Sequence, residues 1–307
     1  MLTINNLYKS YGKFLAVNDL NLEIKKGQIF GFVGPNGAGK TTTMRIVSGL
    51  LNADSGEVYV DGINAIKELR KLKYKIGYMP DFFGVYDNLK TKEYMEFYAS
   101  VYGIVGVDAQ KMGMDLLELV NLVDKAESYV DSLSRGMKQR LCLARCLVHN
   151  PELLILDEPA SGMDPRARYE MKEILKNLRD MGKTIIVSSH ILPELSEVCS
   201  VIGIINQGKM IVSGTMEEIM GKLNYTKRLT IKILGEGDYA KLLLKEIPGI
   251  GKVIMSNNVI TADYNGNEEE AAQILKKLIN SDISVISFAQ EAGNLETLFM
   301  QITEKSV

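Results

Sequence analysis

The order of apolar and polar residues predicts an α/β fold for the first 220 residues. Residues 20–25 alternate between apolar and polar side chains, which is typical of a half-buried strand. Residues 29–33 are apolar throughout, as in a strand of a parallel sheet that helices cover on both faces. Further patterns predict an amphipathic helix at 168–179, and strands at 56–62, 74–79, 153–156 and 184–188 with a hairpin at 202–213.

Two other stretches differ from this alternation. Residues 88–150 repeat apolar side chains at helical spacing, so we expect a helical subdomain there. Residues 221–226 indicate a boundary that closes a domain of residues 1–220. Beyond it, the order strand, helix, two strands, helix, strand predicts a small α+β domain of ferredoxin-like topology at 226–307, in which 295–302 form a last helix.

The segment from Gly34 to Thr41 has the form G-x-x-x-x-G-K-T and lies between the strand at 29–33 and a helix-like run at 42–50. Glycines let such a loop turn tightly and point N–H groups at a phosphate chain, and the following helix adds its positive dipole end. We expect Lys40 to reach the β- and γ-phosphates and the Thr41 hydroxyl to bind Mg²⁺. The loop therefore predicts that the chain binds a nucleoside triphosphate.

Three later segments carry further chemistry. The strand at 153–156 ends in Asp157 and Glu158. The first carboxylate can hold Mg²⁺ through water, and the second can take a proton from an attacking water. Ser134 is of a residue type that caps helix N-termini, and the first turn of the predicted helix has no acid. The helix N-terminus, with basic residues nearby, is therefore a free anion-binding site. His190 follows the strand at 184–189, at the edge where α/β folds bind ligands.

Composition narrows the function. The chain has 307 residues and a formal net charge of -2, so it lacks the basic excess that would indicate nucleic acid as a partner. No apolar run is long enough to cross a bilayer and no signal peptide is visible, so we expect a cytosolic address. The three cysteines fit a reducing compartment. Cys142, Cys146 and His149 have a spacing that could suggest zinc, but we interpret the cysteines as buried free thiols in a helix core, because a zinc site would need a fourth ligand.

Together these motifs resemble those of the ATP-binding cassette (ABC) ATPases. Residues 133–139 resemble the family's signature motif, and residues 153–158 resemble its Walker B strand. Residues 161–164 are similar to its D-loop, and His190 is similar to its switch histidine. The resemblance covers about residues 1–220. It implies a P-loop cassette with a mixed sheet, an N-terminal antiparallel β subdomain and a helical subdomain. Residues 294–299 are similar to the tail of single-cassette ATPases that serve ABC-2 type exporters.

The resemblance implies an ATPase in which two cassettes pack head to tail, with ATP between the phosphate loop of one and the signature of the other. The catalytic residues would be Glu158 as general base, His190 at the γ-phosphate, and Lys40. ATP contacts within the chain would come from Tyr11, which stacks on adenine, and from Gly34, Pro35, Asn36, Gly37, Ala38, Gly39, Lys40, Thr41 and Thr42. The partner's ATP would be bound by Ser134, Arg135 and Gly136, and Mg²⁺ by Thr41, Asp157 and Asp81.

The resemblance also implies partners and a place in the cell. One partner would be a separate transmembrane permease. The other would be a second copy of the chain or a paralogous cassette. The chain would be the ATPase subunit of an exporter, peripheral on the inner face of the cell membrane. The alternative is an ABC-type ATPase that acts on a ribosome or DNA complex. A GTPase switch is not favoured, because the sequence has no N-K-x-D motif.

Two segments depart from the family pattern. Asp81 stands where the family usually has Gln, and in the signature Arg135 and Met137 stand where Gly and Gln are common. A carboxylate at 81 can still reach Mg²⁺ through water. Arg135 either adds a cation near the partner's nucleotide or faces solvent. The apolar cluster that follows Asp81 is either core or a socket for the membrane partner, and its members are Phe82, Phe83, Val85 and Tyr86.

Overall fold

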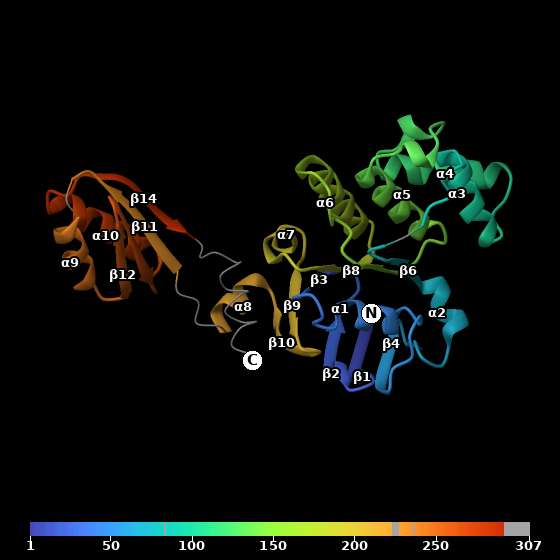
Figure 1. The fold of residues 1–307 in the computed structure, drawn as a ribbon, viewed down its shortest axis with the longest axis horizontal. Coiled ribbons are helices and arrows are strands. Elements are labelled where there is room, and N and C mark those ends of the chain that lie inside the picture. The colour runs from blue at the N-terminus through green and yellow to red at the C-terminus, as the bar shows by residue number, and fades with distance from the viewer. Residues whose placement is uncertain (83, 223–226, 236, 292–307) are drawn as a thin grey trace. The chain divides into compact units, whose positions relative to one another are not determined.

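The structure is a computed structural model that describes residues 1–82, 84–222, 227–235 and 237–291. It divides into two compact units between Met216 and Glu217 (Figure 1). The tail motif at 294–299 and the helix expected at 295–302 lie outside the described residues, as does most of the boundary expected at 221–226.

A six-stranded sheet in the order β10-β9-β3-β8-β7-β6 organises the N-terminal unit. Four of its five pairings are parallel, whereas β9 and β10 form the antiparallel hairpin that the sequence predicts. The five residues of β3 and the four of β7 are all buried, which explains their continuous apolar runs. The strands are β3 (Ile29–Val33), β6 (Ile76–Met79), β7 (Leu153–Leu156), β8 (Thr184–Ser189), β9 (Val201–Asn206) and β10 (Lys209–Gly214).

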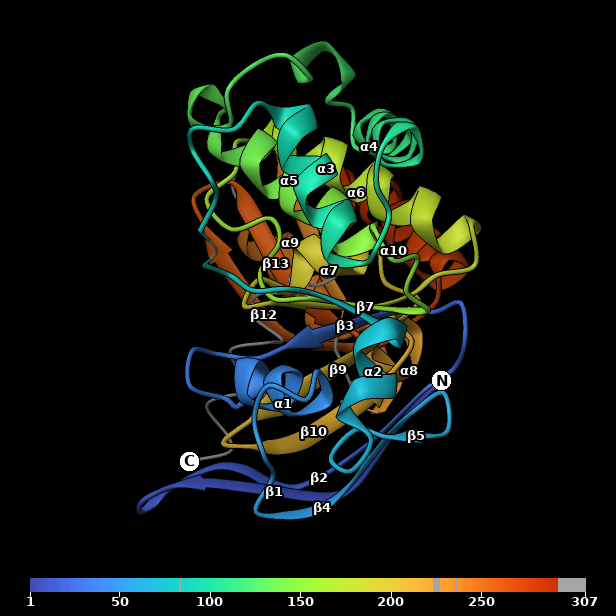
Figure 2. The same ribbon diagram turned by 90° about the vertical axis from the view of Figure 1, so that its right-hand side faces the viewer.

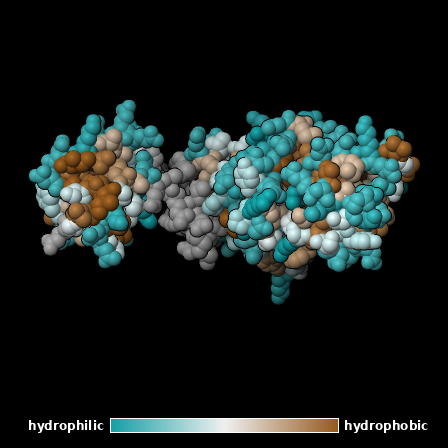
Figure 3. Space-filling model, turned by 90° about the horizontal axis from the view of Figure 1, so that it is seen from above, coloured by the Kyte–Doolittle hydropathy of each residue, from teal (hydrophilic) through white to brown (hydrophobic). Residues whose placement is uncertain are grey.

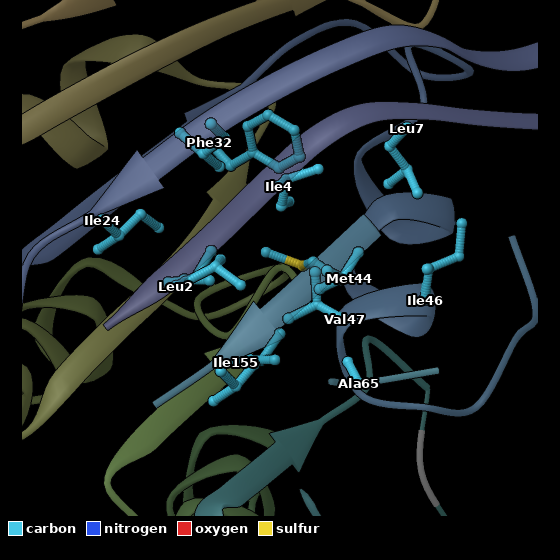
Figure 4. Packing of buried hydrophobic residues seen from close by; sticks show 14 of the residues in the cluster. Leu2, Ile4, Leu7, Ile24, Phe32, Met44, Ile46, Val47, Ala65 and Ile155 are labelled. Carbon is cyan, nitrogen blue, oxygen red and sulfur yellow. The ribbon is translucent and has the colours of Figure 1, made fainter. Parts of the chain in front are cut away.

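A second, antiparallel sheet has the order β2-β1-β4-β5. Helix α1 (Lys40–Val47) lies between this sheet and the six-stranded sheet (Figure 2). Figure 4 shows how side chains from α1, such as Met44 and Val47, meet Leu2 and Ile4 of β1 and Phe32 of β3 in one buried cluster. The strands are β1 (Leu2–Tyr11), β2 (Phe14–Ile24), β4 (Ser55–Val60) and β5 (Ile63–Asn64).

The helical region is an insertion between two neighbouring strands, β6 and β7. It holds α3 (Thr91–Val101), α4 (Val107–Leu119), two short 3₁₀ turns (Val123–Lys125 and Val130–Ser132) and α5 (Arg135–Leu147). Helices α6 (Pro165–Asp180) and α7 (Leu192–Ser196) follow β7 and β8. The strand expected at 74–79 is too long. Residues Leu69–Lys75 form α2 with Leu72 buried and Tyr74 exposed, so the apparent alternation at 74–78 was misleading.

The C-terminal unit has the connectivity strand, helix, two strands, helix, strand that the sequence predicts. Its antiparallel sheet has the order β12-β13-β11-β14, with the β12–β13 turn at Asn257 and Asn258. This is the split βαβ arrangement. Figure 3 shows apolar surface gathered on one face of this unit. After α8 (Met216–Lys222), the elements are β11 (Lys227–Ile233), α9 (Asp238–Lys245), β12 (Ile250–Ser256), β13 (Val259–Tyr264), α10 (Glu268–Asn280) and β14 (Val285–Glu291).

Candidate active site

The loop between β3 and α1 is held in shape by its own lysine. Lys40 Nζ donates to the backbone oxygens of Gly34 at 2.6 Å and Pro35 at 3.3 Å. Gly39 has a φ of +105°, and a Cβ there would lie 2.3 Å from the Ala16 carbonyl oxygen, so only glycine fits. Helix α1 starts without an acidic residue or a side-chain cap, which leaves its first N–H groups available to an anion.

Asp157 and Glu158 follow the buried strand β7, and Ser188 of the neighbouring strand β8 fixes both. Ser188 Oγ donates to Asp157 Oδ1 at 2.7 Å and accepts from the Glu158 N–H at 2.9 Å. Asp157 and Ser188 are each 1% exposed. Sequence reasoning missed Ser188, because it is one of two serines at the end of an apolar strand. Its hydrogen-bond partner Asp157 lies 31 residues away in the sequence.

Glu158 lies between two cationic or ionisable groups. One carboxylate oxygen is 3.8 Å from Lys40 Nζ, and the other is 3.1 Å from His190 Nδ1. Because a carboxylate only accepts hydrogen bonds, His190 carries its proton on Nδ1 in this contact. Burial raises the pKa of Glu158, although Lys40 and His190 oppose the shift. Burial also lowers the pKa of Lys40, and the two acids oppose that shift. The backbone of Glu158 has a φ of 50°, a strained conformation of the kind found at active sites.

These side chains line one cavity of about 340 Å³. The cavity brings together residues from β1, the phosphate loop and the ends of three parallel strands. It also includes Ser161 of the segment 161–164, and Phe14 and Ala16, which sequence reasoning did not single out. The sequence-predicted residues on its wall are Tyr11, Pro35, Asn36, Gly37, Ala38, Gly39, Lys40, Thr41, Thr42, Asp81, Glu158 and His190.

The oxygen atoms near the phosphate loop suit a magnesium ion. The Thr41 side chain and the Asp81 carboxyl line the cavity, and Asp157 is buried beside Glu158. Asp81 Oδ1 is buried and has no hydrogen-bond partner among the described residues. Burial raises the pKa of Asp81, and the charge of Asp157 raises it further. Two carboxylates and a hydroxyl that leave positions for phosphate oxygens fit Mg²⁺ coordination.

The signature residues are not part of this cavity wall. Ser134 caps α5, since its Oγ accepts from the Met137 N–H at 3.3 Å, and the first turn of α5 holds no acid. Arg135 is exposed, but its guanidinium lies against Gly162 of the same chain. Gly136 packs tightly, because a Cβ there would lie 3.0 Å from the Ala167 Cβ.

Two other expectations can be compared with the structure. Phe82 is 86% exposed and Tyr86 is 53% exposed, so the interpretation of these aromatic residues as core is wrong. Cys142 and Cys146 are buried free thiols, as expected. The ring of His149 stacks on Tyr102, its Nε2 is 2.9 Å from the Ile76 carbonyl oxygen, and no group of metal-ligating side chains is found in the described ranges.

The phosphate loop, the two acids after β7 and the histidine after β8 define a P-loop ATPase of the cassette class. Residues 17–161 match the family model described as ABC transporter. The chain is 34% identical to the linearmycin resistance ATP-binding protein LnrL of Bacillus subtilis (strain 168), over 100% of this chain and 99% of that protein. It therefore belongs to the ATP-binding proteins of the ABC transporter family, and it is an ATPase.

Two further similarities agree with this assignment. The Nod factor export ATP-binding protein I of Burkholderia orbicola (strain AU 1054) is 37% identical, over 68% of this chain and 69% of that protein. The cassette MJ0796, solved as a dimer in a post-hydrolysis state bound to ADP and Pi, superposes with a TM-score of 0.64 at 27% identity. That match covers 70% of this chain and 99% of MJ0796. No helix in the described ranges is long and apolar enough to cross a membrane.

Proposed function

We propose that this chain hydrolyses ATP with Mg²⁺ as one half of a head-to-tail cassette pair and so powers export through a separate transmembrane permease. The observation that carries the proposal is the meeting of Lys40, Glu158 and His190 on the wall of one cavity beside the phosphate loop. This arrangement supports in-line attack of water on the γ-phosphate, where catalysis is mostly positioning and charge stabilisation.

Glu158 acts as the general base. Its raised pKa brings it closer to the operating pH, and a base with such a pKa accepts a proton from water more readily. His190 orients this carboxylate and reaches the γ-phosphate, and Lys40 binds the phosphate chain. Thr41, Asp157 and Asp81 would hold Mg²⁺, which when bound neutralises charge on the phosphates.

Closure of the site requires a second cassette, either another copy of the chain or a paralogue. Ser134, Arg135 and Gly136 lie at the N-terminus of α5 and are absent from the cavity wall, which supports a role at the nucleotide of the partner. Two such positive surfaces repel each other, and a bound triphosphate bridges them. The dimeric state of MJ0796 supports the same pairing.

The permease would dock on exposed aromatic side chains near Asp81, namely Phe82 and the pair of Tyr86 and Phe97. Tyr86 and Phe97 stack edge to face at 5.1 Å, and Phe82 directly follows Asp81 at the cavity. The chain would then be peripheral on the cytoplasmic face of the membrane. The Nod factor export relative supports export as the direction, and neither relative is named for a ribosome or DNA, which disfavours that alternative.

The substitution Glu158→Gln tests the proposal. We expect it to abolish ATP turnover while ATP binding persists, because the amide cannot accept a proton but fills the same space. The variant should accumulate as an ATP-bound dimer in size-exclusion chromatography. Glu152→Gln, at the other end of β7, is the matched control and should turn over normally. Wild-type turnover by Glu158→Gln would remove Glu158 as the base.

A further inference from the structure

Arg168 of α6 joins the loop after β7 to the helix after β8. Its Nε donates to the backbone oxygen of Met163 at 3.0 Å, and its Nη1 donates to Glu194 Oε1 of α7 at 2.9 Å. Because guanidinium is planar and always charged, it can hold a carbonyl and a carboxylate at the same time. A lysine could not keep both contacts with one geometry.

Glu194 extends this connection to the chain on both sides of His190. Its second oxygen accepts from Ser189 Oγ at 3.4 Å, and Ser189 Oγ accepts from the Ile191 N–H at 3.0 Å. The His190 side chain is 48% exposed, and among the described residues its ring hydrogen-bonds to Glu158 alone. The position of this exposed ring therefore depends on the backbone that Ser189 and Glu194 fix.

The other end of the connection, residues 161–163, is fixed as well. Gln139 Nε2 of α5 donates to the Ser161 carbonyl at 3.1 Å, and the guanidinium of Arg135 covers Gly162. Ser161 lines the same cavity as Glu158 and His190. The Arg168–Glu194 pair thus links two loops that both border the reacting groups.

We propose that Arg168 and Glu194 are positioning residues for ATP hydrolysis. By linking residues 161–163 to the backbone around His190, they keep the His190 ring within hydrogen-bond reach of Glu158. The proposal rests on the proposed roles of Glu158 and His190. A second ion pair provides a matched control. Lys172 Nζ and Glu197 Oε2 join α6 to the C-terminal end of α7, at 2.7 Å, and within the described ranges this pair has no hydrogen bond to residues 161–163 or 189–191.

The test measures kcat and KM for ATP in the purified full chain, with the melting temperature of each variant. Arg168→Met and Glu194→Gln should each lower kcat about tenfold or more, since small misplacements of catalytic groups have effects of this size. KM for ATP should stay unchanged, because the phosphate loop is untouched. The double variant should lose no more than the worse single variant, because both break one connection. Arg168→Lys should recover only part of the activity.

The control variants Lys172→Met and Glu197→Gln should keep wild-type kcat. If they lower kcat as much as Arg168→Met and Glu194→Gln do, the effect is general loosening of α6 and α7, and the proposal fails. It also fails if the two losses add in the double variant, or if the losses follow KM or melting temperature instead of kcat. Glu158→Gln is measured in the same series, because its turnover alone decides whether Glu158 is the base. Failure of the positioning proposal can therefore be told apart from failure of the proposed function.

Discussion

Ser188 offers the sharpest test of how the acids after β7 are held. Ser188→Ala removes the hydroxyl that donates to Asp157 and accepts from the Glu158 N–H. Both Asp157 and Ser188 are almost completely buried, so water cannot replace the lost partners freely. One lost hydrogen bond involves a charged group and one a neutral amide, which together are worth about 2 to 4 kcal/mol.

This loss of stability is large enough to measure by calorimetry. For a unit of this size, each kcal/mol lowers the melting temperature by roughly 2 to 4 °C, so Ser188→Ala should lower it by about 4 to 16 °C. The matched control is Ser200→Ala, which removes a single bond of 3.2 Å to the Ile29 carbonyl, an oxygen that also accepts from the Ser200 N–H. Equal melting temperatures for the two variants would refute the reasoning.

Two further predictions concern ionisation. Hydrolysis requires the ionised form of Glu158, so the rate should fall with decreasing pH through a pKa above the ordinary 4.5, and an acid limb of the kcat profile at or below 4.5 would contradict this. Asp81 has a raised pKa in the fold, so its charged form destabilises the metal-free protein above its ordinary pKa. Asp81→Asn should therefore raise the melting temperature at pH 7, with the gain lost in acid, and should raise the Mg²⁺ concentration needed for half-maximal turnover. A lower melting temperature with unchanged Mg²⁺ dependence would exclude this role.

Local patterns in the sequence predict much of the fold and the cavity. The phosphate loop can be recognised from the sequence because a buried strand, a glycine-rich turn and a helix follow one another within a few residues. Strand and helix periodicity likewise predict the six described elements of the C-terminal unit after α8. At 74–79 the same reasoning fails, since Tyr74 and Tyr78 share a spacing that fits a strand while α2 continues to Lys75.

Contacts between distant residues could not be predicted. Ser188 and Arg168 belong to segments whose own pattern indicates only a buried strand and an amphipathic helix. Their partners lie 31 and 26 residues away in sequence and meet them only once the sheet has formed. The exposure of Phe82 is a similar case, because nothing in an aromatic run tells a core from an uncovered surface.

The helical region leaves the sheet after β6 and returns at β7, its immediate neighbour. The sheet would keep its hydrogen-bond register if this region were exchanged for another of different length or shape. Of the described residues between β6 and β7, Asp81 at the exit is the one that lines the cavity, and the return at Leu153 lies at the opposite ends of these parallel strands. The layout separates two kinds of evolutionary change: the surface of α3 and α4 can diversify with a new partner, while the signature residues at the start of α5 and the hydrolytic residues on the sheet stay as they are.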